Sequence, residues 1–128
     1  MLWRRHHRYV NGYWVGVYEL PLQETIHREL RPGQTFFDIG ANAGFFTLVA
    51  ALTVGPSGKC VAFEPLPENA ESVREQVELN GLAHCHLVQE AVTNRSGLAD
   101  FSFDTVGDSQ AHIGSSGNSI QVRATTLD

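Results

Sequence analysis

A strand-like run, a glycine turn and a helical run follow one another near the middle of the chain, and this succession most constrains the fold. Residues 35–39 are rich in β-forming side chains without polar alternation, which is typical of a strand covered on both faces. Residues 40–44 are small, and residues 45–54 show a helical apolar pattern that Gly55 and Pro56 end. The order predicts a strand, a tight turn and a helix, the first half of a βαβ unit.

The alternation of strand and helix then continues. We expect a second strand over 59–64, ended by Pro65, an amphipathic helix over 67–80, and a third strand over 85–88 that runs into 90–92. Strands that alternate with helices favour a parallel sheet with right-handed crossovers. The sequence therefore predicts an α/β protein.

The flanking segments show other patterns. Residues 13–18 predict an extended, aromatic-rich lead-in, and Pro21 begins a predicted helix with an apolar face formed by Leu22, Ile26 and Leu30. We therefore divide the chain into a lead-in over 1–20 and a domain over 21–128. Alternating apolar residues near 99–103 and 120–124 predict a β-hairpin with a polar, glycine-rich loop over 107–119.

Composition restricts the class of protein. With 128 residues, 42 % hydrophobic and 18 % charged, the chain suits one globular domain. The net charge of −5 argues against nucleic acid as a partner, and the basic cluster over 4–8 is interpreted as a solvated arm. The longest uncharged stretch, 39–58, is too interrupted to span a bilayer. Two cysteines and no signal-peptide pattern predict a soluble, cytoplasmic protein without a membrane partner.

Three groups of residues stand where the predicted parallel strands end, which is where open α/β sheets bind ligands. The first is Asp38 with the turn that contains Gly40, Ala41, Asn42 and Gly44. Glycines allow a tight turn and close approach to a ligand, and the helix that follows directs its amides at an anionic group.

The other two groups are acidic. Glu64 ends the second strand, where its carboxylate can accept two hydrogen bonds from a ribose diol, and Glu90 with Ala91 can bind the amino group and a ring nitrogen of adenine. Together the three groups predict a site for a nucleoside with an anionic or zwitterionic tail. Each alone is weak evidence, since tight turns require glycine and a strand-end glutamate is usually solvated.

The motifs resemble a known family. The Asp-x-Gly-x-Asn-x-Gly pattern over 38–44 resembles motif I of the class I S-adenosylmethionine-dependent methyltransferases, and Phe63-Glu64-Pro65 resembles their acidic second motif. Four blocks are more specifically similar to the FkbM family, within a resemblance that runs from about residue 12 to the last residue: 35–47, 62–69, 79–81 and 126–128.

The resemblance implies a Rossmann-like fold, S-adenosyl-L-methionine as cofactor, and methyl transfer to a hydroxyl oxygen of a small-molecule or sugar-containing acceptor. It implies that the 38–44 loop surrounds the methionine moiety, that Glu64 holds the ribose hydroxyls, and that Leu66, after Pro65, packs on the adenine. Glu90 would contact the adenine amine. The catalytic base stays unknown.

The family pattern continues beyond Thr126-Leu127-Asp128, into a strand that neighbours the first strand. We therefore expect an incomplete class I fold, with parallel strands 1–3, their helices and a β-hairpin, and with the downstream strands absent. The chain would be the N-terminal part of a longer enzyme or a truncated product. Phe36, Phe37 and Ile39 would then lie on an unpaired sheet edge, through which the protein could self-associate.

Other functions are weighed against this one. A nicotinamide-dependent oxidoreductase requires the fingerprint Gly-x-Gly-x-x-Gly after the first strand. The corresponding positions here hold Gly40, Asn42 and Phe45, so two of the three glycines are missing. A non-catalytic fragment that scaffolds or regulates stays a third hypothesis.

Metal and hydrolase sites are also considered. Cys60, His84, Cys85 and His86 match no structural zinc spacing, so we interpret them as buried or half-buried strand residues. Ser109 and His112 have neither the nucleophile elbow nor the oxyanion-hole pattern of a hydrolase in the sequence around them.

Overall fold

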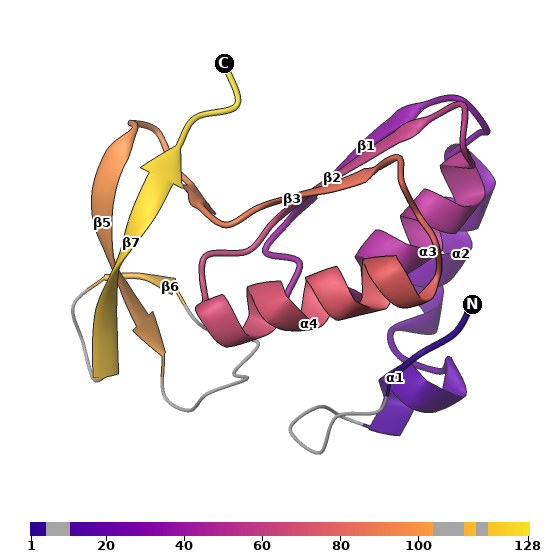
Figure 1. Ribbon diagram of the computed structural model, residues 1–128, viewed down its shortest axis with the longest axis horizontal. Helices are drawn as coiled ribbons and strands as arrows, with labels where there is room; N and C mark the ends of the chain where they lie inside the picture. Colours follow the sequence, from indigo (N-terminus) through magenta and orange to yellow (C-terminus); the bar gives the residue numbers. More distant parts are fainter. Residues whose placement is uncertain (5–10, 104–111, 115–117) are drawn as a thin grey trace.

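The computed structural model describes residues 1–4, 11–103, 112–114 and 118–128. The helices are α1 (Asn11–Val15), α2 (Leu20–Glu29), α3 (Phe45–Val54) and α4 (Pro67–Leu79). The strands are β1 (Thr35–Ile39), β2 (Lys59–Phe63), β3 (Cys85–Val88), β4 (Ala91–Val92), β5 (Gly97–Phe103), β6 (His112–Ile113) and β7 (Asn118–Thr125) (Figure 1). Most of the cluster over 4–8, Ser109 and the side chain of His112 lie outside the described residues.

The first sheet is parallel, with the strand order β1-β2-β3. Its register pairs Phe37 with Val61 and Val61 with His86. Figure 1 shows α2, α3 and α4 on one side of this sheet. The predicted βαβαβ unit is confirmed, and α3 begins and ends at the predicted residues.

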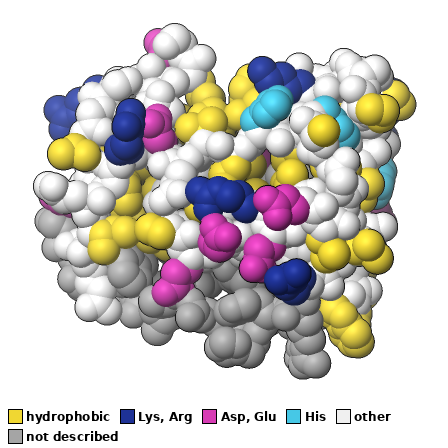
Figure 2. Space-filling view, viewed as in Figure 1, with side chains coloured by type: hydrophobic (Ala, Val, Ile, Leu, Met, Phe, Trp, Pro, Cys, Tyr) yellow, Lys and Arg dark blue, Asp and Glu magenta, His cyan; other side chains and the backbone are white. Residues whose placement is uncertain are grey.

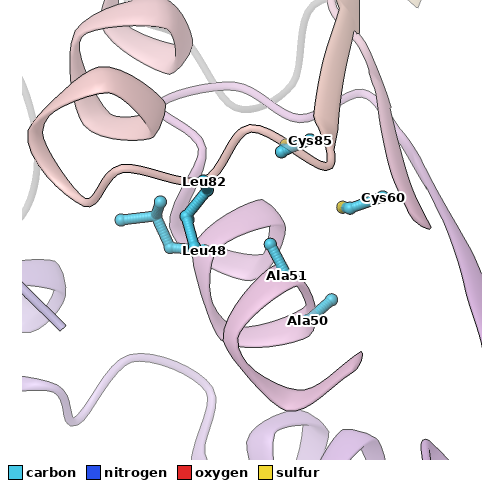
Figure 3. Close-up of a cluster of buried hydrophobic side chains, with 6 residues drawn as sticks. All are labelled: Leu48, Ala50, Ala51, Cys60, Leu82 and Cys85. Carbon is cyan, nitrogen blue, oxygen red and sulfur yellow. The ribbon is translucent and has the colours of Figure 1, made fainter. Parts of the chain in front are cut away.

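The core lies between this sheet and α3. Cys60 and Cys85 are register partners on β2 and β3, and both side chains point from the sheet towards the alanines of α3 (Figure 3). One buried cluster joins the two strands to the helix: Leu48, Ala50, Ala51, Cys60, Leu82 and Cys85. Alanine and cysteine are small, so the helix can approach the strands closely.

The opposite face of the sheet is apolar and partly exposed. Phe37 is 53 % exposed and Ile39 is 54 % exposed, whereas Phe63 on the central strand is 7 % exposed. Within the described part of the chain, β1 pairs only with β2 and is therefore an edge strand. The predicted unpaired edge, with its apolar side chains partly bare, is confirmed. The interpretation of this run as a strand covered on both faces is wrong, because Phe37 and Ile39 are more than half exposed on one face.

The second sheet has the order β4-β7-β5-β6. Its centre is the predicted hairpin, in which Phe101 pairs with Ile120. The strand β6 was not predicted, because two residues carry too little pattern. β6 lies within the expected loop and pairs with β5. β4 shows that the prediction of a third strand running on to residue 92 is wrong, since Ala91 pairs with Ala124 in the second sheet.

The prediction of an extended lead-in is also wrong, because residues 11–15 form α1. Tyr13 on this helix is 6 % exposed, and its ring stacks on Phe45 at 5.4 Å between centroids. Aromatic packing therefore overrides the β propensity of this segment. None of the described helices has both the length and the apolar character needed to cross a bilayer.

Candidate functional site

The loop between β1 and α3 contains a left-handed residue at every second position. The φ angles of Gly40, Asn42 and Gly44 are 81°, 50° and 87°. Glycine and asparagine tolerate this region better than other residues do, which explains the alternating pattern of the motif. At Gly44 space is also restricted, because an added Cβ would lie 3.3 Å from the Cγ2 of Val73 on α4.

Backbone hydrogen bonds tie this loop to the end of β2. The amides of Gly40 and Ala41 donate to the carbonyl oxygen of Phe63 at 2.9 and 3.0 Å, and the amide of Gly44 donates to Ala41 at 2.8 Å. These three amides are therefore engaged within the protein and do not serve as donors to an anionic group. Such donors would have to come from the first turn of α3, which lacks intrahelical partners.

Glu64 joins the loop to the start of α4. Its Oε2 accepts a hydrogen bond from the Asn42 amide at 2.7 Å, and its Oε1 accepts one from the Leu66 amide at 2.9 Å. The side chain is 4 % exposed. Burial raises the pKa of the Glu64 carboxyl, while the hydrogen bonds from Leu66, Asn42 and Asn69 act to lower it.

Asp38 is the second carboxylate of the site. Thr47 on the first turns of α3 donates its hydroxyl to Asp38 Oδ2 at 2.5 Å. Burial raises the pKa of Asp38, and the hydrogen bonds from Thr47 oppose this change. The Asp38 charge also raises the pKa of Glu64, so the two carboxylates act on each other electrostatically. Thr47 and Asn69 were missed as site residues, although both lie inside the sequence blocks that carry the resemblance.

One polar atom in this region has no partner. Asn42 Oδ1 is buried without a hydrogen bond, alone among the side-chain nitrogen and oxygen atoms of the described residues. An orphaned acceptor is costly in a folded protein. A ligand that supplies an N–H or O–H group here would remove that cost.

The third predicted group lies elsewhere. Glu90 stands on the connection between the two sheets, and its Oε1 forms an ion pair with Arg123 Nε on β7 at 3.0 Å. Ala91 is buried within β4. Hydrogen bonds therefore connect the C-terminal ends of β1 and β2, whereas Glu90 is bonded to the second sheet. Pro65 and Leu66 are both buried beside Glu64.

An apolar groove lies on the helix side of β1, beside Asp38. Its volume is about 350 Å³. It is lined by Leu22, Thr25, Ile26, Glu29, Leu30, Phe36, Asp38 and Phe46. Ile26 and Leu30 of the predicted α2 face pack inward, whereas Leu22 is 41 % exposed at the rim.

The cysteines and histidines occupy structural positions. Cys60 and Cys85 are free and buried, and the hydrogen bond with Cys85 together with burial raises the pKa of the Cys60 thiol. His84 donates from Nε2 to the carbonyl oxygen of Ala51 at 2.8 Å, whereas His86 is exposed. Within the described ranges, no three potential metal ligands gather.

Comparison with known proteins identifies the kind of fold. The family model described as Vibrio cholerae RfbT protein matches residues 4–111. The solved SAM-dependent O-methyltransferase of Thermotoga maritima superimposes with a TM-score of 0.50 and 25 % identity, over 55 % of this chain and 28 % of that one. The fold is thus the Rossmann-like fold of class I methyltransferases, in partial form.

Two curated relatives are also methyltransferases. Protein-L-isoaspartate O-methyltransferase of Triticum aestivum is 35 % identical over 60 residues, which are 47 % of this chain and 26 % of the relative. The 31-O-demethyl-FK506 methyltransferase FkbM of Streptomyces tacrolimicus is 37 % identical over 75 residues, or 59 % and 28 %. The chain therefore spans about a quarter of the length of these relatives. The resemblance to class I methyltransferases is confirmed, and the narrower FkbM assignment stays a prediction.

Proposed function

The chain belongs to the Vibrio cholerae RfbT protein family, and we propose that it is the N-terminal part of an S-adenosyl-L-methionine-dependent methyltransferase. Residues 21–128 form its part of the catalytic domain. The acceptor is a hydroxyl oxygen of a small or sugar-containing molecule, as in an FkbM-type enzyme, which the identity with FkbM supports. A cytoplasmic location is supported by the two free, buried thiols.

The bridge from Glu64 to Asn42 is the observation that carries this proposal. It brings an acidic residue at the end of β2 onto the left-handed loop that follows β1, at 2.7 Å. A strand-end glutamate without a ligand role would be expected to extend into solvent. Here it is buried next to a second carboxylate, an arrangement that places negative charge at the carboxyl end of a parallel sheet.

The residues present fit the cofactor. Asn42 Oδ1 would accept a hydrogen bond from the ammonium group of the methionine moiety. Glu64 already accepts hydrogen bonds from Leu66, Asn42 and Asn69, which leaves one of its about four acceptor positions for a ribose hydroxyl. Neither Lys nor Arg lies between Arg31 and Lys59, so the loop offers no cation that would repel a sulfonium.

The remaining assigned residues act on the nucleoside. Leu66 would pack on the adenine, and Glu90 with Ala91 would bind its polar edge. Glu90 must then exchange Arg123 for the adenine amine, at the cost of an ion pair on a largely exposed arginine. S-adenosyl-L-methionine supplies an electrophilic methyl group when bound, and this chain contributes by holding the donor in a fixed position.

Calorimetric titration of the full chain tests the proposal. S-adenosylmethionine and S-adenosylhomocysteine should bind, and NAD should not. Glu64→Ala should weaken binding at least about tenfold, equivalent to 1.4 kcal/mol. The matched control is Glu71→Ala, which alters an exposed carboxylate on α4 and should leave the affinity unchanged.

Two outcomes separate this proposal from its rivals. Binding of NAD alone would favour the oxidoreductase and contradict the proposal. Binding of S-adenosylmethionine by the complete protein without methyl transfer to any hydroxyl acceptor would favour a scaffolding or regulatory role. A circular dichroism melt of Glu64→Ala distinguishes lost affinity from lost structure, since this side chain also anchors the loop.

A further inference from the structure

The N-terminal residues are bound to α4 by two carboxamide side chains. Gln76 Oε1 accepts a hydrogen bond from the Arg4 amide at 3.0 Å, and Gln76 Nε2 donates to the Arg4 carbonyl oxygen at 3.0 Å. Asn80 repeats the arrangement on Leu2, accepting from its amide at 2.6 Å and donating to its carbonyl oxygen at 2.7 Å. Each carboxamide thus forms a two-bond pair with the backbone of one residue.

The spacing of these pairs matches an extended peptide. Gln76 lies on α4 and Asn80 caps its C-terminal end, so the two are four residues apart, which corresponds to a rise of about 6 Å along a helix. Leu2 and Arg4 are two residues apart, which corresponds to about 6.6 Å in an extended chain, where the peptide groups of alternate residues face the same side. The two side chains therefore replace the edge of a neighbouring strand. The contact depends on backbone groups that any residue except proline carries.

Selectivity comes from the residue between the two bonded positions. Trp3 packs against both buried clusters that surround α3. Its ring lies 5.6 Å from Tyr13 and 6.0 Å from Phe45, the latter in an edge-to-face arrangement. A large aromatic ring fills this position and gains both apolar burial and favourable ring contacts.

Charge adds a second preference. Arg4 forms an ion pair with Glu75 at 3.4 Å, and α4 also carries Glu68, Glu71 and Glu78. Figure 2 shows acidic side chains gathered on the face of the molecule where α4 lies in Figure 1. A basic residue directly after the aromatic one therefore suits this surface, although an exposed pair of this kind contributes little energy.

Gln76 is 1 % exposed. This burial holds with residues 1–4 in place, and both polar atoms of the side chain bond the Arg4 backbone. If residues 1–4 left the surface, water or another extended backbone would have to replace these two hydrogen bonds.

We propose that α4, together with the rings of Tyr13 and Phe45, forms a peptide-recognition site. Residues 1–4, Met1-Leu2-Trp3-Arg4, are its tethered occupant. The site selects an extended segment with an aromatic residue between two backbone-bonded positions and a basic residue after it. It shares no residue with the proposed cofactor set, so it stands or falls independently of the methyltransferase assignment.

Binding in trans tests the site. A variant that lacks residues 1–4 should bind the amidated peptide of residues 1–4 with one-to-one stoichiometry in a calorimetric titration. Gln76→Ala in this variant, or Trp3→Ala in the peptide, should each weaken binding at least tenfold. Asn94→Ala, which removes an exposed carboxamide between β4 and β5, serves as the matched control and should change affinity less than twofold.

Absence of saturable binding by a shortened variant that still melts cooperatively would overturn the proposal, as would equal binding of the Trp3→Ala peptide. A second measurement uses the full chain, in case the shortened variant does not fold. Hydrogen exchange followed by NMR should show a protected Arg4 amide, and Gln76→Ala should remove that protection while the α4 amides keep theirs. An Arg4 amide that exchanges at the rate of an unstructured chain in the unaltered protein would equally refute the site.

Discussion

The buried Glu64 and the half-buried Asp38 dominate the chemistry at the level of single residues. Glu64 satisfies both its oxygens with backbone amides, yet burial still raises its pKa. Asp38 shows the same direction for the same reason. Each carboxyl is thus held in an environment that disfavours its charge, which a positively charged ligand would relieve.

The pH dependence of stability follows from these two shifts. A carboxyl whose folded pKa is raised binds its proton more tightly in the folded state, so its stabilising contribution is complete below the ordinary value near 4 and declines as pH rises through the folded pKa. We therefore expect the unfolding free energy attributable to Asp38 and Glu64 to fall with rising pH in this window. Urea denaturation at several pH values measures this. The unfolding free energy of Glu64→Gln should decline less steeply with pH than that of the unaltered protein, and identical slopes would contradict a raised pKa of Glu64.

Two glycines of the loop separate backbone strain from packing. Gly40 has a φ of 81° and open space around a hypothetical Cβ, so Gly40→Ala should lose about 1–2 kcal/mol through strain alone. Gly44→Ala meets similar strain and also presses on Val73, which should cost about 1–3 kcal/mol more. Chemical denaturation of both variants gives the comparison. Equal losses would show that α4 yields at this contact without cost.

At the level of elements, α3 is held to β1 by a polar contact as well as by apolar packing. Thr47 is fully buried on α3 and donates its hydroxyl to Asp38 on β1. The contact fixes the distance between the helix start and the strand end, and these two ends bound the loop of the candidate site.

Replacement of this threonine tests the contact. Thr47→Val keeps the shape and removes the hydroxyl donor, so the unfolding free energy should fall by about 1.5–3 kcal/mol, the range for a hydrogen bond to a charged group. Thr53→Val is the matched control on the same helix, where the hydroxyl donates only to the Val49 carbonyl oxygen, and should change stability by less than about 0.5 kcal/mol. Similar losses of unfolding free energy in the two variants would show that the hydrogen bond to Asp38 stabilises the protein no more than the bond within the helix.

For the whole molecule, the bare side of the first sheet has consequences for assembly. Phe37 and Ile39 are more than half exposed on an edge strand, next to the buried Phe63. An apolar edge with unpaired backbone groups is a template for strand pairing with another chain. We therefore expect this chain by itself to self-associate through β1.

Sedimentation velocity over a range of concentrations measures this association. Phe37→Lys should lower the average mass, because a charged side chain on an edge strand opposes pairing. Leu98→Lys alters a side chain that is 70 % exposed on β5 of the second sheet and should have no effect. A chain that stays monomeric throughout, or an equal response of the two variants, would argue against β1 as the interface.

Prediction of the fold succeeded where patterns are local and strong. The runs that form β1, α3, β2, α4 and β3 were recognised within one or two residues, because buried strands and helices with clear ends show in neighbouring residues. Prediction failed at α1, where the aromatic side chains suggested an extended lead-in and the packing of Tyr13 on Phe45 accompanies a helix. It also failed at β4 and β6, whose pairing depends on distant partners.

The same division applies to the candidate site. The sequence by itself determined the left-handed loop and the strand-end carboxylates, because steric limits on φ and the order of elements act along the chain. Only the tertiary structure decided that Glu64 reaches across 22 residues to Asn42, and that Glu90 pairs with Arg123 of the second sheet. Hydrogen bonds and ion pairs of this kind depend on distances in space, which close only when the helices and sheets have packed.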